Sequence, residues 1–307
     1  DARPYFGFVS FVGPHPPIAP PIPFNRMYDP DAMPNPIRGD AAVDHLDEQI
    51  PWMNHAVWAE DINDSLARKI RARYYGKISH IDQSRGRILD AVESRPDADN
   101  TVIVFFSDHG DHLGDHNGWQ KESFFDVSCR VPYLVSWPAK IAAGQVRSDL
   151  VCLTDLFGIA TGAAGKQELR QGHDVLGLLA GAVTARKNAI GLYGVPGTPR
   201  FKIMVREKEW KYIYFANGAV EQLFNVQDDP NEVRTRIADA PDVAQRLREV
   251  AIEACKNTNV DRALNSQGFV SFPYGPRPLQ RILQFDQSRG ITGFPKTPAE
   301  VSRGMLA

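Results

Sequence analysis

A long amphipathic helix that leads directly into an apolar strand constrains the fold of this chain more than any other feature. Apolar residues recur at helical spacing from Glu60 to Glu93, with arginines and lysines between them. Arg95-Pro96-Asp97 ends this pattern, and Thr101–Phe106 (TVIVFF) is then apolar throughout. A helix that returns to an apolar strand is the crossover unit of a parallel sheet. The order therefore predicts an α/β protein with a mainly parallel sheet and helices on both faces.

Further segments extend this predicted core. Tyr5–Val12 (YFGFVSFV) is aromatic and β-branched, so we expect a buried strand there. The proline-rich run 14–36 cannot form helix and should run extended over the surface, although a rigid linker is an alternative. Val131–Trp137 indicates another strand, and Leu153–Thr161 a short helix after it.

Beyond about residue 188 the pattern changes to short strands separated by turn residues, which is typical of an antiparallel α+β subdomain. The expected strands and helix are Phe201–Val205, Lys211–Phe215, Glu221–Val226 and Asp239–Lys256. We therefore predict an α/β core over residues 1–187, a small antiparallel subdomain over 188–257, and an extended tail over 258–307. We expect the tail to wrap over the core or over a neighbouring subunit. The second alternative would make the protein a homo-oligomer.

Composition excludes several classes of function. The 307 residues carry a formal charge of -2, which gives no basic stripe for nucleic acid or an anionic membrane. The longest apolar runs fall short of the roughly 20 residues that a membrane span needs. The 3 cysteines form no CxxC pair, which slightly favours a reducing, cytoplasmic compartment over the periplasm. The start at Asp1, without Met or signal peptide, indicates a cut inside a larger fold or the mature end of a processed chain. The N-terminus therefore predicts no targeting.

The densest polar cluster, SDHGDHLGDH (107–116), follows the strand TVIVFF without a gap. Asp108 and His109 lie nearest the strand end, where a carboxylate and a neutral imidazole suit a divalent metal. For His112 and His116 a solvated loop is an equally good or better interpretation. Two ligands are too few for an ion that wants about four to six donors. The other ligands must come from elsewhere.

Two more residues carry chemistry if the fold brings them to the same place. Lys121 could hold an oxyanion, although a lone lysine is normally a solvated surface charge. His15 follows the first predicted strand, at the end where α/β sheets build their sites.

Taken together, these residues resemble the sulfatase family of the alkaline-phosphatase superfamily. SDHGDHLGDH with Lys121 and RVPYLVSWP is similar to the family's second conserved block, and GPHPP (13–17) to an earlier one. Residues 74–89 resemble the family's long helix, and residues 210–232 its C-terminal subdomain. The resemblance covers roughly residues 3 to 256, with the blocks in the family's order.

The resemblance implies a role for each matching residue. Asp108 and His109 would be the late pair of metal ligands, Lys121 would contact the sulfate or phosphate oxygens, and His15 would assist the leaving group. Many sulfatases have asparagine at the position of His109, and histidine resembles the branch that includes phosphonate monoester hydrolases and some arylsulfatases. Calcium or manganese is the expected metal, with zinc less favoured.

The chain departs from the family pattern at the nucleophile. It contains neither the Cys-x-Pro-x-Arg nor the Ser-x-Pro-x-Arg motif whose first residue becomes formylglycine, and Cys129-Arg130-Val131-Pro132 has its proline one place too late. The family's early aspartate pair is also absent. We interpret the chain as the C-terminal portion of an arylsulfatase-like sulfuric ester hydrolase, inactive alone. Its expected partners are a sulfate or phosphonate ester and a missing N-terminal segment that carries the formylglycine. A phosphonate or phosphate ester hydrolase, a phosphomutase, or a non-catalytic domain are the alternatives.

Overall fold

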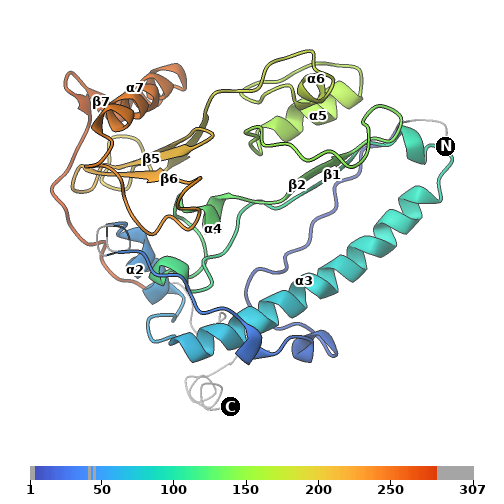
Figure 1. Ribbon diagram of the computed structural model, residues 1–307, viewed down its shortest axis with the longest axis horizontal. Helices are drawn as coiled ribbons and strands as arrows, with labels where there is room; N and C mark the ends of the chain where they lie inside the picture. Colours follow the sequence, from blue (N-terminus) through green and yellow to red (C-terminus); the bar gives the residue numbers. More distant parts are fainter. Residues whose placement is uncertain (1–3, 41–42, 44–45, 282–307) are drawn as a thin grey trace. The chain divides into compact units, whose positions relative to one another are not determined.

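The computed structural model describes residues 4–40, 43 and 46–281, which form two compact units (Figure 1). Unit 1 comprises residues 1–36, 51–95 and 279–307, and unit 2 comprises residues 37–50 and 96–278. The predicted boundaries at residues 187 and 257 both lie within unit 2, so the three-part division stays a prediction about subdomains.

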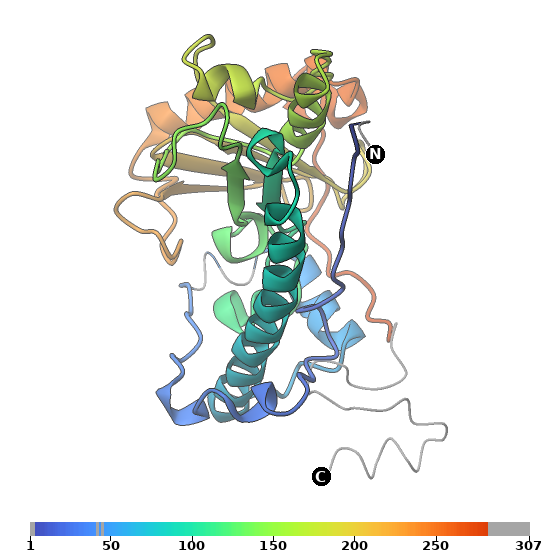
Figure 2. The ribbon, with the colours of Figure 1, turned by 90° about the vertical axis from the view of Figure 1, so that its right-hand side faces the viewer.

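Unit 1 is built on one long helix, α3 (Asp64–Glu93), which Figure 2 shows as a single uninterrupted element. This confirms the predicted helix, with a start four residues later than Glu60. The start is set by Asn63, whose side-chain oxygen accepts a hydrogen bond from the Leu66 amide at 2.9 Å and so caps the first turn. The shorter helical elements are η1 (Phe24–Arg26), η2 (Pro30–Ala32) and α2 (Gln49–Ala56), the last belonging to unit 1 from Pro51 onward.

Helix α3 holds the proline-rich run in place. The Lys77 ammonium donates to the carbonyls of His15 and Pro17, at 2.9 and 2.8 Å. Farther along, the backbone of Phe24 passes so close to Gly76 that a Cβ there would lie 2.1 Å from the Phe24 carbonyl oxygen. The run therefore forms extended backbone and short 3-10 turns packed on a helix, in agreement with the predicted absence of α-helix.

The prediction of a buried strand at Tyr5–Val12 is wrong. None of these residues is in a strand, and Phe6 and Val12 are 79% and 82% exposed. A strand needs a neighbour that takes its N–H and C=O groups, and no segment in the described ranges pairs with this one. Tyr5 instead packs under the Arg95 guanidinium, 4.5 Å from the ring centroid.

Unit 2 contains the two strands on either side of the polar cluster. β1 (Ile103–Phe106) and β2 (Tyr133–Ser136) confirm the predicted strands and pair antiparallel, with Phe105 opposite Leu134. Both of these side chains are exposed, at 38% and 55%, so one face of this two-stranded sheet is open to solvent. Every strand ladder in the described residues is antiparallel, and their parallel pairing is limited to an isolated bridge between Asn217 and Phe272, so the predicted parallel sheet is not seen within them.

The second sheet of unit 2 is a four-stranded antiparallel sheet in the order β3-β4-β5-β6. Its strands are β3 (Ala189–Tyr193), β4 (Lys202–Arg206), β5 (Trp210–Phe215) and β6 (Val220–Asn225). The last three confirm the predicted strands to within one residue at each end, whereas β3 was not predicted. Its sequence, AIGLY, has a glycine at its centre, which weakens the strand signal.

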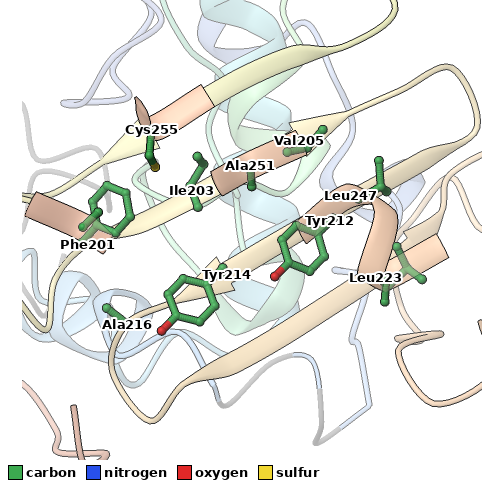
Figure 3. Packing of buried hydrophobic residues seen from close by; sticks show 12 residues of the cluster. Phe201, Ile203, Val205, Tyr212, Tyr214, Ala216, Leu223, Leu247, Ala251 and Cys255 are labelled. Carbon is green, nitrogen blue, oxygen red and sulfur yellow. The ribbon is translucent and has the colours of Figure 1, made fainter. Parts of the chain in front are cut away.

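Both faces of this sheet are buried. Ile203, Tyr212 and Leu223 pack against α7 (Pro241–Asn257), the predicted amphipathic helix (Figure 3). Residues of the opposite face pack against Phe125, which follows the polar cluster in sequence. The sheet therefore serves as a platform for the segment that follows β1.

Short elements complete unit 2. They are η3 (Ala98–Asn100), η4 (Asp115–Asn117), α4 (Asp126–Cys129), α5 (Asp155–Ala163), α6 (Val175–Leu179), η5 (Asp261–Ala263), β7 (Leu264–Asn265) and β8 (Gly268–Phe269). Helix α5 confirms the helix predicted after β2.

The start of the tail packs on unit 2 itself. Phe269 stacks on Tyr214 with ring centroids 4.2 Å apart, and Asn217 exchanges two hydrogen bonds with the backbone of Gly275. These contacts are to the predicted small subdomain, so the expectation that the tail wraps over the core or a neighbouring subunit stays a prediction. The rest of the predicted tail, residues 282–307, lies outside the described residues. Among the described helices none is long and apolar enough to cross a membrane.

Candidate active site

The loop between β1 and α4 has an unusual backbone. Five of its residues other than glycine have positive φ, a conformation that costs an L-residue about 1–3 kcal/mol. They are Leu113, His116, Asn117, Gln120 and Glu122. Such backbone persists only where surrounding contacts hold it, and it gathers at functional sites. Lys121 lies between the last two of these residues.

Asp108 and His109 bring two donor atoms close together at the start of this loop. The distance from Asp108 Oδ2 to His109 Nε2 is 3.4 Å. Two ligands at about 2.1 Å from one ion lie about 3.0–3.4 Å apart at octahedral or tetrahedral angles, so this spacing fits a shared metal. The side chain of Asp108 is 80% exposed, and its other oxygen, Oδ1, accepts a hydrogen bond from the His109 amide at 3.0 Å.

The hydrogen bonding of His109 suits the same role. Its Nδ1 lies 2.8 Å from the Gly110 carbonyl oxygen, which can only accept, so Nδ1 carries the proton. In the neutral ring Nε2 then carries the lone pair, on the side of Asp108. A histidine that donates one nitrogen to a carbonyl and offers the other is the usual arrangement of a metal ligand.

Asp111 is a half-buried residue that the sequence did not single out. Its Oδ1 accepts hydrogen bonds from the amides of Leu113 and Gln120, both at 3.0 Å, which ties two parts of the loop together. Burial raises the pKa of Asp111, and the nearby charges of Lys121 and His109 act in the opposite direction. Lys121 and His109 therefore both lie within electrostatic reach of one carboxylate. The sequence contains a signal for this role, because glycine-containing turns follow Asp111 and their backbone N–H groups need a hydrogen-bond acceptor.

The expectation that His112 and His116 face water is wrong, because each is only 1% exposed. His112 Nδ1 donates to the Asp115 carbonyl at 2.9 Å, and its Nε2 accepts from the Ser123 hydroxyl at 2.7 Å. Burial lowers the pKa of His112 to about 4. His116 stacks on Phe125 with centroids 3.8 Å apart. Both rings hold the loop and its platform together and are not candidate ligands.

The structure leaves part of the predicted site incomplete. No group of three or more His, Cys, Asp or Glu side chains that could hold a metal occurs among residues 4–40, 43 and 46–281. Cys129 lies on α4 with the residue as a whole exposed, but desolvation of its thiol raises the pKa, so it stays protonated at neutral pH. His15 belongs to unit 1, whereas Asp108, His109 and Lys121 belong to unit 2, so the grouping of all four stays a prediction.

Comparison with known proteins decides the family. The Sulfatase family model matches residues 1–166, and the model described as "N-sulphoglucosamine sulphohydrolase, C-terminal" matches residues 114–256. The chain belongs to the sulfatase family. The predicted resemblance is thereby confirmed, and with it the hydrolase class of the chain's relatives.

Two curated relatives illustrate this membership. The sulfatase chain is 29% identical to an arylsulfatase of Clostridium perfringens over 260 residues, which is 82% of this chain and 53% of the relative. It is 31% identical to a choline-sulfatase of Rhizobium meliloti over 252 residues, or 78% of this chain and 47% of the relative. The chain thus spans about half the length of the curated relatives it matches.

A solved structure confirms the α/β fold class of this sulfatase chain. The phosphonate monoester hydrolase of Agrobacterium radiobacter matches with a TM-score of 0.69 and 28% identity, over 89% of this chain and 61% of that one. Sulfatases are in general metal-dependent, in keeping with the pair formed by Asp108 and His109.

Proposed function

We propose that this chain is the C-terminal portion of a metal-dependent sulfuric ester hydrolase of the arylsulfatase type. The carrying observation is the pair Asp108 Oδ2 and His109 Nε2, 3.4 Å apart, at the strand end of a strained loop that also carries Lys121. Further support comes from the family match and from relatives named as sulfatases.

In this proposal Asp108 and His109 supply part of a site for calcium or manganese, with zinc less favoured. The metal, when bound, supplies positive charge that polarises the ester oxygens. The Lys121 ammonium holds the charged oxygens of the ester. His15 donates a hydrogen bond or proton to the leaving group from Nε2, because Nδ1 already donates to the Pro16 carbonyl at 2.8 Å. Nε2 can act as this donor only while the ring carries both protons. The formylglycine nucleophile and the remaining ligands belong to an N-terminal segment outside this sequence.

A second candidate is hydrolysis of a phosphonate or phosphate ester at the same residues. It is favoured by the likeness to a phosphonate monoester hydrolase over 89% of the chain. Tetrahedral sulfate and phosphonate esters place similar oxygens on the same cation, so the choice between them rests on measured substrate preference.

The proposal is tested by expressing the chain together with its upstream sequence. We expect hydrolysis of an aryl sulfate ester, bound calcium or manganese, and a Cys-x-Pro-x-Arg or Ser-x-Pro-x-Arg motif upstream. A faster phosphonate ester reaction would favour the second candidate, and absence of the motif with no turnover of either ester would favour a non-catalytic domain.

Replacement of Asp108 tests its assigned role directly. In the complete enzyme Asp108→Ala should lower kcat/KM by about a thousand-fold or more, because it removes a metal ligand. In this chain alone the same change should alter the free energy of unfolding by less than about 0.5 kcal/mol, since the carboxylate is exposed. Asp228→Ala, at an exposed turn of unit 2, is the matched control and should leave both unchanged. Retained turnover in Asp108→Ala would refute the role.

A further inference from the structure

Two buried lysines of the four-stranded sheet contact the segment that directly follows Lys121 in sequence. The Lys202 ammonium, on β4, donates to the Glu122 carbonyl at 2.5 Å and forms an ion pair with Asp47. The Lys211 ammonium, on β5, donates to the Phe124 carbonyl at 2.8 Å and forms ion pairs with Asp126 and Glu232. The two strands thus hold two carbonyls that are two residues apart.

The lysines lie on the face of the sheet that packs against the loop. Along β4 and β5 alternate residues share a face, so Lys202 and Lys211 accompany Met204 and Ile213, which pack in the same cluster as Phe125. Lys202 is 3% exposed, and three aromatic rings surround its ammonium, with the Tyr193 ring centroid 4.7 Å away. A lysine is placed in such surroundings only when it has a charged partner, which here is Asp47.

Glu122 needs this support because its backbone is strained. Its φ is 81°, and that of Gln120, on the other side of Lys121, is 67°. The Glu122 side chain is held as well: the Gln49 amide donates to Oε2 at 2.5 Å, and Arg277 donates to Gln49 Oε1 at 2.7 Å. Backbone and side chain of the residue after Lys121 are therefore both fixed from outside the loop.

We propose that Lys202, neutralised by Asp47, is a positioning residue for Lys121. By holding the Glu122 carbonyl, Lys202 keeps the strained backbone in a single conformation. This conformation keeps the Lys121 ammonium within electrostatic reach of Asp111. The inference rests on the proposed function only in giving Lys121 the task of binding the ester anion. The holding of the loop itself follows from the contacts of Lys202.

The test uses the double variant Lys202→Met with Asp47→Asn. Methionine matches the length of the lysine stem. Asparagine keeps the side-chain oxygen that, in Asp47, accepts a hydrogen bond from the backbone N–H of Gln49 at 3.1 Å. No charge is left buried without its partner, so the global cost of breaking a buried pair is reduced. In this chain, hydrogen exchange of the amides of residues 118–123 should accelerate about ten-fold or more, while those of β5 stay protected.

The same variant in the complete enzyme gives the catalytic readout. KM for a sulfate ester, and the inhibition constant of inorganic sulfate, should rise about ten-fold, because the anion loses a fixed cation. The control is Arg186→Met, which breaks the ion pair of Arg186 with the buried Asp155 on α5 and should lower stability without changing either readout.

Exchange at residues 118–123 that is unchanged in the double variant would overturn the proposal, whatever the activity. Faster exchange with an unchanged KM for the sulfate ester and an unchanged inhibition constant of inorganic sulfate would overturn the link to Lys121. Should the complete wild-type protein hydrolyse no ester, the proposed function fails, and the exchange measurement still decides whether Lys202 holds the loop.

Discussion

The side chains that define this site at the residue scale differ mainly in how they meet water. Asp108 is exposed and available as a ligand, whereas His112, four residues later, is sealed inside the loop with both ring nitrogens hydrogen-bonded. Burial favours the neutral ring and lowers the pKa of His112 to about 4. A group that is neutral when folded and able to protonate when unfolded makes stability depend on pH.

The sign of this dependence follows from which state binds the proton. Between about pH 6.5 and pH 4 the unfolded histidine is protonated and the folded one is not, so stability falls as the pH falls. The contribution is fully present above the unfolded pKa, and about 2 kcal/mol of it should be lost by pH 5. Urea unfolding at pH 7.5 and pH 5.0 measures the loss.

His112→Asn is expected to remove most of that pH dependence, while lowering stability at pH 7.5 because Ser123 loses its acceptor. His173→Asn, which changes a histidine bonded to the Thr184 carbonyl in the same unit, is the control and should leave the decline in place. An equal decline in wild type and His112→Asn would show that His112 does not titrate in this window.

The sequence singled out exposed residues of the candidate site and misjudged buried ones. Asp108 and His109 stand out because they follow an apolar strand without a gap, and their role as metal ligands stays a prediction. His112 and His116 were misjudged because Phe125, on which His116 stacks, is itself covered by residues distant in sequence, such as Met204 and Ile213, and nothing local shows the burial. Lys202 was missed for a related reason: a lysine within FKIMV carries no local mark that both faces of its strand are covered.

At the scale of elements, helices and paired strands were predictable where the sequence contains both partners. β4, β5 and β6 are neighbours in sequence and in the sheet, so turn signals and apolar runs locate all three. Tyr5–Val12 has an equally strong strand pattern, yet a pattern gives only the propensity of a strand. A strand also needs a hydrogen-bonding neighbour, and no segment of the described residues pairs with Tyr5–Val12.

Helix α3 offers a matched pair of glycines that tests its packing. A Cβ at Gly76 would lie 2.1 Å from the Phe24 carbonyl oxygen, whereas nothing lies within 4 Å of one at Gly86. Gly76→Ala should therefore lower the free energy of unfolding by about 2 kcal/mol or more, because backbone must move. Gly86→Ala should raise it by up to about 1 kcal/mol through helix propensity. Chemical denaturation of both variants checks this, and equal effects would contradict the close contact of α3 with η1.

At the scale of the whole molecule, the proposed function predicts weak metal binding by this chain alone, because the chain would supply only part of the ligand set. The chain spans 53% of the arylsulfatase it matches, and its described residues bring one carboxylate and one imidazole together. Each additional ligand multiplies affinity, because the ion is dehydrated once and held by donors already in place.

A metal titration therefore separates the chain from the complete protein. With two ligands the chain should bind manganese or calcium only at about millimolar concentration, so 1 mM metal, as a probe of about one Kd, should stabilise it by less than about 0.5 kcal/mol. The complete protein, with about four to six ligands, should gain several kcal/mol at the same concentration, because metal then exceeds Kd about a thousand-fold. Thermal unfolding with and without metal measures both, and Asp108→Ala should abolish the gain in the complete protein. Micromolar binding by the chain alone would mean that its own residues complete the site, and the proposed division of ligands between two segments would be wrong.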